Sequence, residues 1–155
     1  MTTEFERDPV REFLESASEA KLEIARHHAR VAELESRATK VTASLHAAPG
    51  GGGSDTQQIW VVLAEERDKA MEAEKLELER YHAVESFIDR MQDKRHRVIL
   101  RLRYLNALSW IRVQMKLYES GFYYSESHIK KLHGKALNAA RELWRKEHEA
   151  DEVHP

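Results

Sequence analysis

Apolar residues recur at alternating steps of three and four residues over the first third of the chain. This spacing keeps one face of an α-helix apolar through about five heptads. It predicts a long helix that begins at Asp8 and Pro9, because proline is tolerated in the first helical turn. Ten of the eleven positions are apolar. The positions are Val10, Phe13, Ala17, Ala20, Ile24, His27, Val31, Leu34, Ala38, Val41 and Leu45.

Residues 49–54 interrupt this pattern with a proline, four consecutive glycines and a serine. Such a run favours no regular structure, so it predicts a break. Asp55 or Thr56 is placed to cap a second helix that reaches about Gln92. Its middle is polar. The apolar positions are Ile59, Leu63, Ala70, Ala73, Leu76, Val84, Phe87, Ile88 and Met91.

Two long helices joined by a glycine-rich break predict an antiparallel hairpin. A coiled coil between chains would show the same line of apolar residues, here called the seam, along each helix. The first seam is shallow, because several of its members are alanine, and the second helix is the less apolar partner. These features favour association between chains, so we expect a homo-oligomer formed through the N-terminal helices.

The remainder predicts three shorter helices. Asp93, Ser109 and Ser125 each stand where an N-cap residue is expected. The first helix, residues 94–106, has an apolar face of Val98, Ile99, Leu102 and Leu105. The second turns Trp110, Val113 and Leu117 inward. The third turns inward Ile129, Leu132, Ala136, Leu137, Ala140 and Leu143 or Trp144. The predicted fold class is therefore all-α.

Composition excludes several classes of protein and of metal site. The chain has 155 residues and no cysteine, which excludes disulfides and a cysteine-ligated zinc finger. Its acidic first residues lack the apolar core of a signal peptide. The longest apolar run, residues 59–64, is far shorter than the roughly 20 residues of a membrane helix. We expect a cytoplasmic protein without membrane contact.

Charge is segregated along the chain. Residues 93–146 carry thirteen Lys or Arg against four Asp or Glu, a local net of +9 in a chain whose total is −2. Residues 1–92 sum to −7 and residues 147–155 to −4. We therefore expect a long hairpin or coiled coil over 1–92, a basic domain over 93–146 and an acidic tail over 147–155. A segregated basic segment is typical of a phosphate-binding surface.

Within the basic domain, two capped helices in succession read as a helix-turn-helix. In that motif the second helix enters the major groove, and its N-terminal half faces the bases of double-stranded DNA. Ser127, His128 and Lys131 are placed for base edges, and Lys130 and Lys135 for phosphates. A rotation of the helix by one position would reassign them. The candidate DNA-binding residues are Arg112, Lys116, Ser125, Ser127, His128, Lys130, Lys131 and Lys135.

No pattern of residues indicates catalysis or a cofactor. His27 and His28 are adjacent on a helix and form a poor chelate. Glu79 and His82 match the Glu-x-x-His spacing of di-iron bundles, but those proteins need two copies and two further glutamates. A phosphate-binding glycine loop and an activated serine are also absent. We predict neither enzymatic activity nor a metal.

Residues 84–144 resemble phage-encoded transcription regulators of the RinA/ArpU type, which are similar to region four of sigma factors. The resemblance rests on Ile88-Asp89-x-Met91, Arg97-x-x-Leu100-x-x-Arg103-Tyr104-Leu105 and Ser109-Trp110-x-x-Val113. Its most specific part is Tyr124-Ser125-x-x-x-Ile129-x-x-Leu132-His133-Gly134-x-Ala136-Leu137. The resemblance implies DNA binding at phage or prophage promoters, typically of late genes, and RNA polymerase as a further partner.

The chain departs from this family at the turn of the motif. Residues 118–123 stand where such proteins usually have about one residue, and Gln114 stands where a small residue is usual. Tyr118, Phe122 and Tyr123 either fold over the core or reach the DNA backbone, and we expect packing. His133 is expected to be a structural hydrogen-bonding residue. Gly134 allows either a close helix contact or a close backbone contact.

Two other functions are compatible with the pattern. Small terminase subunits, which recognise DNA for packaging, also join a helix-turn-helix to oligomerising helices. Alternatively, the protein is a coiled-coil adaptor that acts through residues 10–92. The sequence favours the transcription regulator, because the basic charge coincides with the capped helices.

Overall fold

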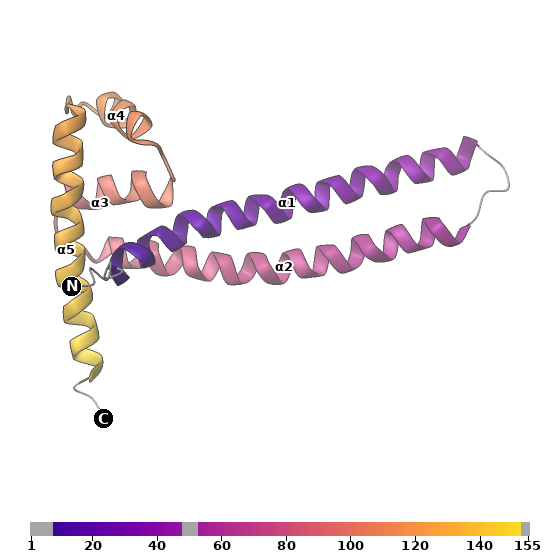
Figure 1. Cartoon of the computed structure of the whole chain (residues 1–155), viewed down its shortest axis with the longest axis horizontal. Helices are drawn as coiled ribbons and strands as arrows, with labels where there is room; N and C mark the ends of the chain where they lie inside the picture. Colours follow the sequence, from indigo (N-terminus) through magenta and orange to yellow (C-terminus); the bar gives the residue numbers. More distant parts are fainter. Residues whose placement is uncertain (1–7, 48–52, 153–155) are drawn as a thin grey trace, which may run out of the picture. The chain divides into compact units, whose positions relative to one another are not determined.

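The structure, a computed structural model, describes residues 8–47 and 53–152 (Figure 1). Its elements are α1 (Pro9–Ala47), α2 (Gly53–Asp89), α3 (Lys94–Leu100), the π-helical turn η1 (Arg101–Leu105), α4 (Trp110–Glu119) and α5 (Glu126–Glu152). The described residues contain no strand, which confirms the predicted all-α class. Helix α2 begins at Gly53, before the predicted cap at Asp55 or Thr56. Residues 48–52 of the predicted break lie outside the described residues.

The chain divides into two compact units. The hairpin unit is Ala20–Glu79. The core unit joins residues 8–19 to residues 80–152, so it holds the start of α1 and the end of α2 together with α3, η1, α4 and α5. Sequence patterning instead places a boundary at residue 92, and thereby assigns both helix ends to the hairpin.

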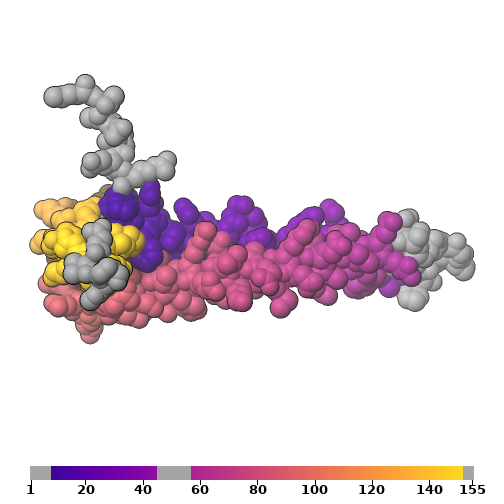
Figure 2. Space-filling view, turned by 90° about the horizontal axis from the view of Figure 1, so that it is seen from below, coloured from indigo at the N-terminus to yellow at the C-terminus, as the bar shows by residue number. Residues whose placement is uncertain are grey.

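In the hairpin unit, α1 and α2 lie side by side and antiparallel, as Figures 1 and 2 show. Leu34 and Ala38 of α1 are buried against Leu63 of α2. Polar pairs join the helices as well: the Arg67 guanidinium lies 2.6 Å from the Glu35 carboxylate, and His28 Nε2 lies 3.2 Å from Glu74. The long helices of one chain therefore pack on each other, as the hairpin interpretation predicts.

Much of the apolar surface of α2 is nevertheless exposed in this unit. Leu76, which the sequence pattern assigned to the apolar face, is 61% exposed, so that assignment is wrong. Trp60 and Met71 are exposed too. The reason is that the apolar residues in the middle of α2 do not follow one stripe, and a single partner helix covers only one stripe.

The core unit contains the main hydrophobic core. From α1 it takes Val10, Leu14 and Ala17, of which Leu14 was not among the predicted seam positions. Phe13 of α1 packs edge-on against Phe87 of α2, with ring centroids 5.5 Å apart, and its ring lies 5.0 Å from that of Trp144 on α5. The remaining buried residues of this core are Val84, Ile88, Met91, Ile99, Leu100, Tyr104, Leu105, Val113, Leu117, Ile129, Leu132, Ala136, Leu137 and Ala140.

Helix α3 follows α2 after a short polar link. Asp93 caps it as predicted, because its carboxylate accepts the Arg95 N–H at 2.8 Å. The Arg97 side chain turns back and donates to the carbonyls of Met91 and Gln92, which follow the end of α2. One arginine of the basic segment is thus used to close a helix junction.

The predicted helix over residues 94–106 changes to π-helical pairing at Arg101. The Asn106 N–H donates to the Arg101 carbonyl five residues earlier. This pairing brings residues five apart towards the same face, so Tyr104 and Leu105 are buried with Ile99 and Leu100. The apolar face predicted from α-helical spacing is therefore only partly correct: Val98 and Leu102 are half-buried.

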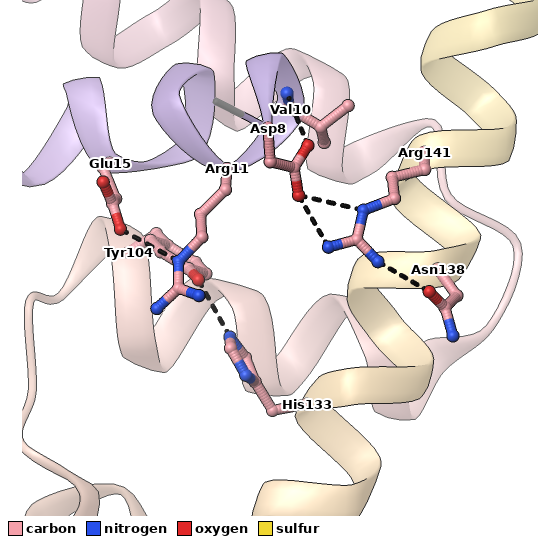
Figure 3. Close-up of polar contacts among 8 residues, drawn as sticks. All are labelled: Asp8, Val10, Arg11, Glu15, Tyr104, His133, Asn138 and Arg141. Carbon is pink, nitrogen blue, oxygen red and sulfur yellow. Dashed lines mark hydrogen bonds and ion pairs between the residues drawn. The ribbon is translucent and has the colours of Figure 1, made fainter. Parts of the chain in front are cut away.

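Both ends of the core unit are fixed by carboxylate contacts. At the start of α1, Asp8 accepts the Val10 N–H at 3.1 Å and pairs with Arg141 of α5 at 2.6 Å (Figure 3). Partial burial raises the pKa of Asp8, but the Arg141 hydrogen bond and charge outweigh it and hold that pKa below its usual value. In the predicted acidic tail, residues 147–152 continue α5, and Glu147 pairs with Arg90 at 2.6 Å. Residues 153–155 lie outside the described residues.

None of the described helices combines the length and apolar character that crossing a bilayer requires.

Candidate nucleic-acid interface

Helices α4 and α5 begin at the serines that the sequence predicted as caps. The Ser125 hydroxyl accepts the His128 N–H at 3.1 Å, and the Ser109 hydroxyl accepts the Arg112 N–H at 3.4 Å. Each bond satisfies a backbone donor that the first helical turn leaves unpaired. Helix α5 packs against both α3 and α4 (Figure 1).

The long turn between these helices has defined hydrogen bonds at both ends. At the end of α4, Gly121 has φ +90°, the Gly121 N–H donates to the Tyr118 carbonyl and the Phe122 N–H donates to the Leu117 carbonyl. This is a Schellman motif, which glycine favours because it adopts positive φ without strain. Near the start of α5, the Gln114 amide donates to the Tyr124 carbonyl at 3.1 Å. The Gln114 side chain thus joins α4 to the residue that follows the long turn.

The predicted inward faces of α4 and α5 are confirmed. Val113 and Leu117 of α4 are buried, and Trp110 is half-buried against the core. On α5 the buried residues are Ile129, Leu132, Ala136, Leu137 and Ala140, with Leu143 and Trp144 half-buried. This packing fixes which side of α5 faces solvent.

All eight candidate DNA-binding residues have exposed side chains: Arg112, Lys116, Ser125, Ser127, His128, Lys130, Lys131 and Lys135. By helical spacing, Ser127, Lys131 and Lys135 follow one another at steps of four along the face opposite the buried residues. His128 and Lys130 lie on the two flanks of that face. Lys135, which the sequence analysis assigned to phosphates, is in line with Lys131 on this face.

The side chains of this face differ in their partners. Lys130 pairs with Glu126 at 3.2 Å, and Lys116 pairs with Glu119 at 3.6 Å. Both pairs are exposed, so each contributes little stability and is open to exchange for another anion. The His128 ring lies 4.4 Å from that of Tyr124, which restricts its orientation. Lys131 and Lys135 form no ion pair with any residue in the described part of the chain.

The basic segment also contains arginines outside the candidate set. Several arginines are held by the protein itself. Arg103 donates to the Leu108 carbonyl and stacks on Trp110 with its guanidinium carbon 4.4 Å from the ring centre. Arg101 pairs with Asp89. The net +9 of the sequence therefore overstates the positive charge that is not already paired within the protein.

The prediction that the aromatic residues of the turn fold over the core is wrong for two of them. Tyr118 is 64% exposed and Tyr123 is 74% exposed. Their rings pack on each other at 4.8 Å, nearly perpendicular, rather than on the core. Phe122 lies closer to the protein, stacked on the half-buried Tyr124 at 5.8 Å. Tyr118 is part of α4 and lies on the exposed side of that helix, which also carries Ile111 and Met115.

His133 lies on the inward side of α5 and is buried. Its Nε2 forms a 2.9 Å hydrogen bond with the Tyr104 hydroxyl (Figure 3). Its structural placement agrees with the prediction. Burial, with the positive charges of Arg11, Arg103 and Arg141, lowers the pKa of His133 from 6.5 to about 4. Burial also raises the pKa of Tyr104. The pair is thus neutral near pH 7 and joins η1 to α5.

For Gly134 the sequence left open a close helix contact and a close backbone contact, and the structure bears on the first of them. A methyl group added there would meet no atom of the described chain within 4 Å. Close helix packing therefore does not require this glycine. It lies near the outward face of α5, towards the Lys130 side.

Sequence reasoning missed three groups beside this face. Asn138 is exposed one turn beyond Gly134 and accepts a 2.7 Å hydrogen bond from Arg141. Lys94 and Arg95 line a small hollow with Phe122 and Tyr124. Ile111 and Met115 of α4 are exposed apolar residues. The sequence did indicate the last pair. Ile111 and Met115 are apolar, are four residues apart, and lie on the side of α4 opposite its predicted inward face, where polar residues are expected.

Within the described residues, His, Asp and Glu side chains form no cluster of three that would hold a metal ion. Comparisons with protein-family models, with curated proteins and with solved structures each give no match to this chain.

Proposed function

We propose that the protein is a sequence-specific, DNA-binding transcription regulator that places the N-terminal half of α5 in the major groove. The observation that carries this proposal is the two-sided character of α5. One face is buried in the core, and the opposite face presents Ser127, Lys131 and Lys135 to solvent. A cationic helix face on a rigid support is what major-groove insertion requires.

The roles of the side chains follow from their positions. Ser127 and Lys131, in the middle of the outward face, are assigned to base edges, where lysine pairs best with guanine. His128, oriented by Tyr124, is assigned to an adjacent base edge. Lys130, Lys135, Arg112 and Lys116 are assigned to phosphates, which fix orientation without reading sequence.

The resemblance to RinA/ArpU-type regulators extends the proposal to phage or prophage late genes and to RNA polymerase as a partner. Exposed apolar residues on α2, such as Trp60 and Met71, support association of the hairpin unit with a second copy. The same surface supports the adaptor function as the second candidate. A small terminase subunit would share the DNA contact but form a closed ring.

The salt dependence of DNA affinity tests the proposal. In the variant Lys130→Ala/Lys131→Ala/Lys135→Ala, affinity for any duplex should fall, because phosphate contacts are lost. The slope of log K against log salt should become shallower by about 0.9 for each contact removed. The matched control is Lys40→Ala/Lys69→Ala/Lys75→Ala, which removes the same charge from exposed lysines of the hairpin unit. Equal binding by the parent and the first variant would exclude this face of α5 as the DNA surface.

Base reading is tested separately. His128→Ala or Ser127→Ala should change the sequences selected from a random duplex pool while leaving the salt slope close to that of the parent. An unchanged selected sequence in both variants would contradict their assignment to base edges.

A further inference from the structure

Helix α2 carries a second line of residues beside the one that packs on α1. The packed line is buried or half-buried and recurs at alternating steps of four and three residues: Ile59, Leu63, Glu66, Ala70, Ala73 and Glu77. The residue after each of these forms the second line: Trp60, Ala64, Arg67, Met71, Glu74 and Leu78. A shift of one residue turns the face by about 100° around the helix, so the second line lies beside the α1 contact and not opposite it.

This second line is mostly apolar and open to solvent. Trp60, Met71 and Leu78 are 44%, 69% and 38% exposed, and Ala64 is exposed as well. From Trp60 to Leu78 the line runs for about 27 Å of helix, and apolar side chains aligned over such a length mark a contact surface. In a four-helix bundle each helix packs on two neighbours that lie about 90° apart around it. Helix α2 has two such faces, and α1 covers one of them.

The two charged members of the second line have opposite signs. The Arg67 guanidinium lies 2.6 Å from Glu35 of α1, and Glu74 lies 3.2 Å from His28 Nε2. Both pairs are partly exposed, so each is weak and open to exchange. Arg67 and Glu74 are therefore available to a partner that brings the opposite charge to each.

The order of residues along the second line is self-complementary when one copy is reversed. Trp60 and Leu78 are centred on residue 69, and Arg67 and Glu74 are centred between residues 70 and 71. Met71 adjoins both centres. These three centres agree to within two residues, about 3 Å of helix. A two-fold axis near residue 70 thus sets apolar against apolar residues and arginine against glutamate, as an interface between identical copies requires.

The charges also decide the direction of pairing. A parallel pair would set Arg67 beside Arg67 and Glu74 beside Glu74, and opposed like charges destabilise a contact. A partner of uniform charge, such as nucleic acid, would repel one of the two residues. An antiparallel second copy satisfies both.

We propose that two copies of the chain associate through the second line of α2, antiparallel about a two-fold axis near residue 70, and join their hairpins into a four-helix bundle. Trp60 of each copy packs near Leu78 of the other, and the two Met71 side chains meet at the axis. Arg67 pairs with Glu74 of the second copy, twice by symmetry. This inference rests on the self-association that is part of the proposed function and adds its surface, direction and symmetry.

The chain has no cysteine, so single cysteine substitutions test this arrangement directly. Met71→Cys should form a disulfide-linked dimer under mild oxidation, because only residues near the axis bring their Cα atoms to the roughly 4.4–6.8 Å that a disulfide needs. Trp60→Cys is the matched control on the same line. Its two copies stand about 30 Å apart and should stay unlinked, whereas a mixture of Trp60→Cys and Leu78→Cys proteins should link. Leu22→Cys on α1, at a side chain 66% exposed, gives the background from random collision.

A charge exchange tests the polar pairs in sedimentation experiments without DNA. Arg67→Glu should raise the dissociation constant of the dimer on the order of tenfold, because two attractive pairs become repulsive. Arg67→Glu/Glu74→Arg should restore it. The restoration cannot come from within the hairpin, since the new carboxylate at position 67 still faces Glu35. Circular dichroism checks that each variant keeps the helical content of the parent.

Three results would overturn the inference: a parent that sediments as a monomer, Met71→Cys that links no more than Leu22→Cys, or Trp60→Cys that links to itself, which indicates a parallel pair. An Arg67→Glu variant that associates like the parent also overturns it. None of these results bears on the DNA contact of α5, which the triple-lysine variant tests. If that variant binds DNA like the parent while the cysteine pattern holds, the DNA surface fails and the dimer stands.

Discussion

At the scale of single residues, the unusual side chains of this chain have structural partners. The Gln114 side chain donates to the Tyr124 carbonyl and so fixes the distal end of the turn. His133, the middle residue of the Leu132-His133-Gly134 run, has a structural role because its hydrogen bond to the Tyr104 hydroxyl joins α5 to η1. Burial of a neutral histidine has a consequence for pH dependence.

The unfolded chain takes up a proton on His133 near pH 6.5, whereas the folded protein does so only near pH 4. The stability that this group contributes is complete above pH 6.5 and is lost as pH falls towards 4. We predict that His133→Gln flattens the dependence of the unfolding free energy on pH in this window, by up to about 1.4 kcal/mol per pH unit. Urea unfolding at several pH values measures it.

The control for this prediction is Tyr104→Phe. It removes the hydrogen bond but leaves the buried imidazole, so overall stability falls while the pH dependence persists. Parallel pH profiles for the parent and His133→Gln would show that His133 is not the responsible group.

At the scale of elements, the starts of the three shorter helices were predicted correctly from the sequence. Asp93, Ser109 and Ser125 cap α3, α4 and α5 as predicted, because a cap depends on residues within one turn of each other. The π-helical turn η1 was not predicted. Its pairing is selected by burial of Tyr104 and Leu105 against other helices, which local spacing does not contain.

The cap bonds differ in length and should differ in strength. Ser125→Ala, which removes a bond of 3.1 Å, should lower the unfolding free energy by about 1 kcal/mol, and Asp93→Ala, which removes a bond of 2.8 Å, should lower it as well. Ser109→Ala removes a 3.4 Å bond and should cost less. Denaturant titration of the three variants checks the order. A larger loss for Ser109→Ala than for Ser125→Ala would contradict it.

At the scale of the whole molecule, the core unit is built from both ends of the chain. Ser18 donates to the Tyr104 carbonyl, and the Tyr81 hydroxyl donates to the adjacent Leu105 carbonyl. The points at which α1 leaves and α2 returns are therefore held beside each other on η1. This arrangement makes residues 20–79 removable in principle.

We predict that a chain in which a short Gly/Ser linker replaces residues 20–79 folds cooperatively and keeps the helical content of the core unit. A fragment of residues 93–152, cut at the boundary suggested by the sequence, should not fold, because it lacks Val10, Leu14 and Phe87 and exposes Ile99 and Leu100. Thermal unfolding followed by circular dichroism distinguishes them. Cooperative unfolding of the 93–152 fragment at the parent's midpoint would restore the boundary at residue 92.

The sequence alone determined the helical class, the three caps and the inward faces of α4 and α5. Each depends on periodicity or on contacts within one turn of a helix. Tertiary structure decided the rest: the burial of Leu14, the exposure of Leu76, the outward aromatic turn and the joining of residues 8–19 to 80–152. These features depend on which surfaces meet across long stretches of chain, and the same local pattern is compatible with several such pairings.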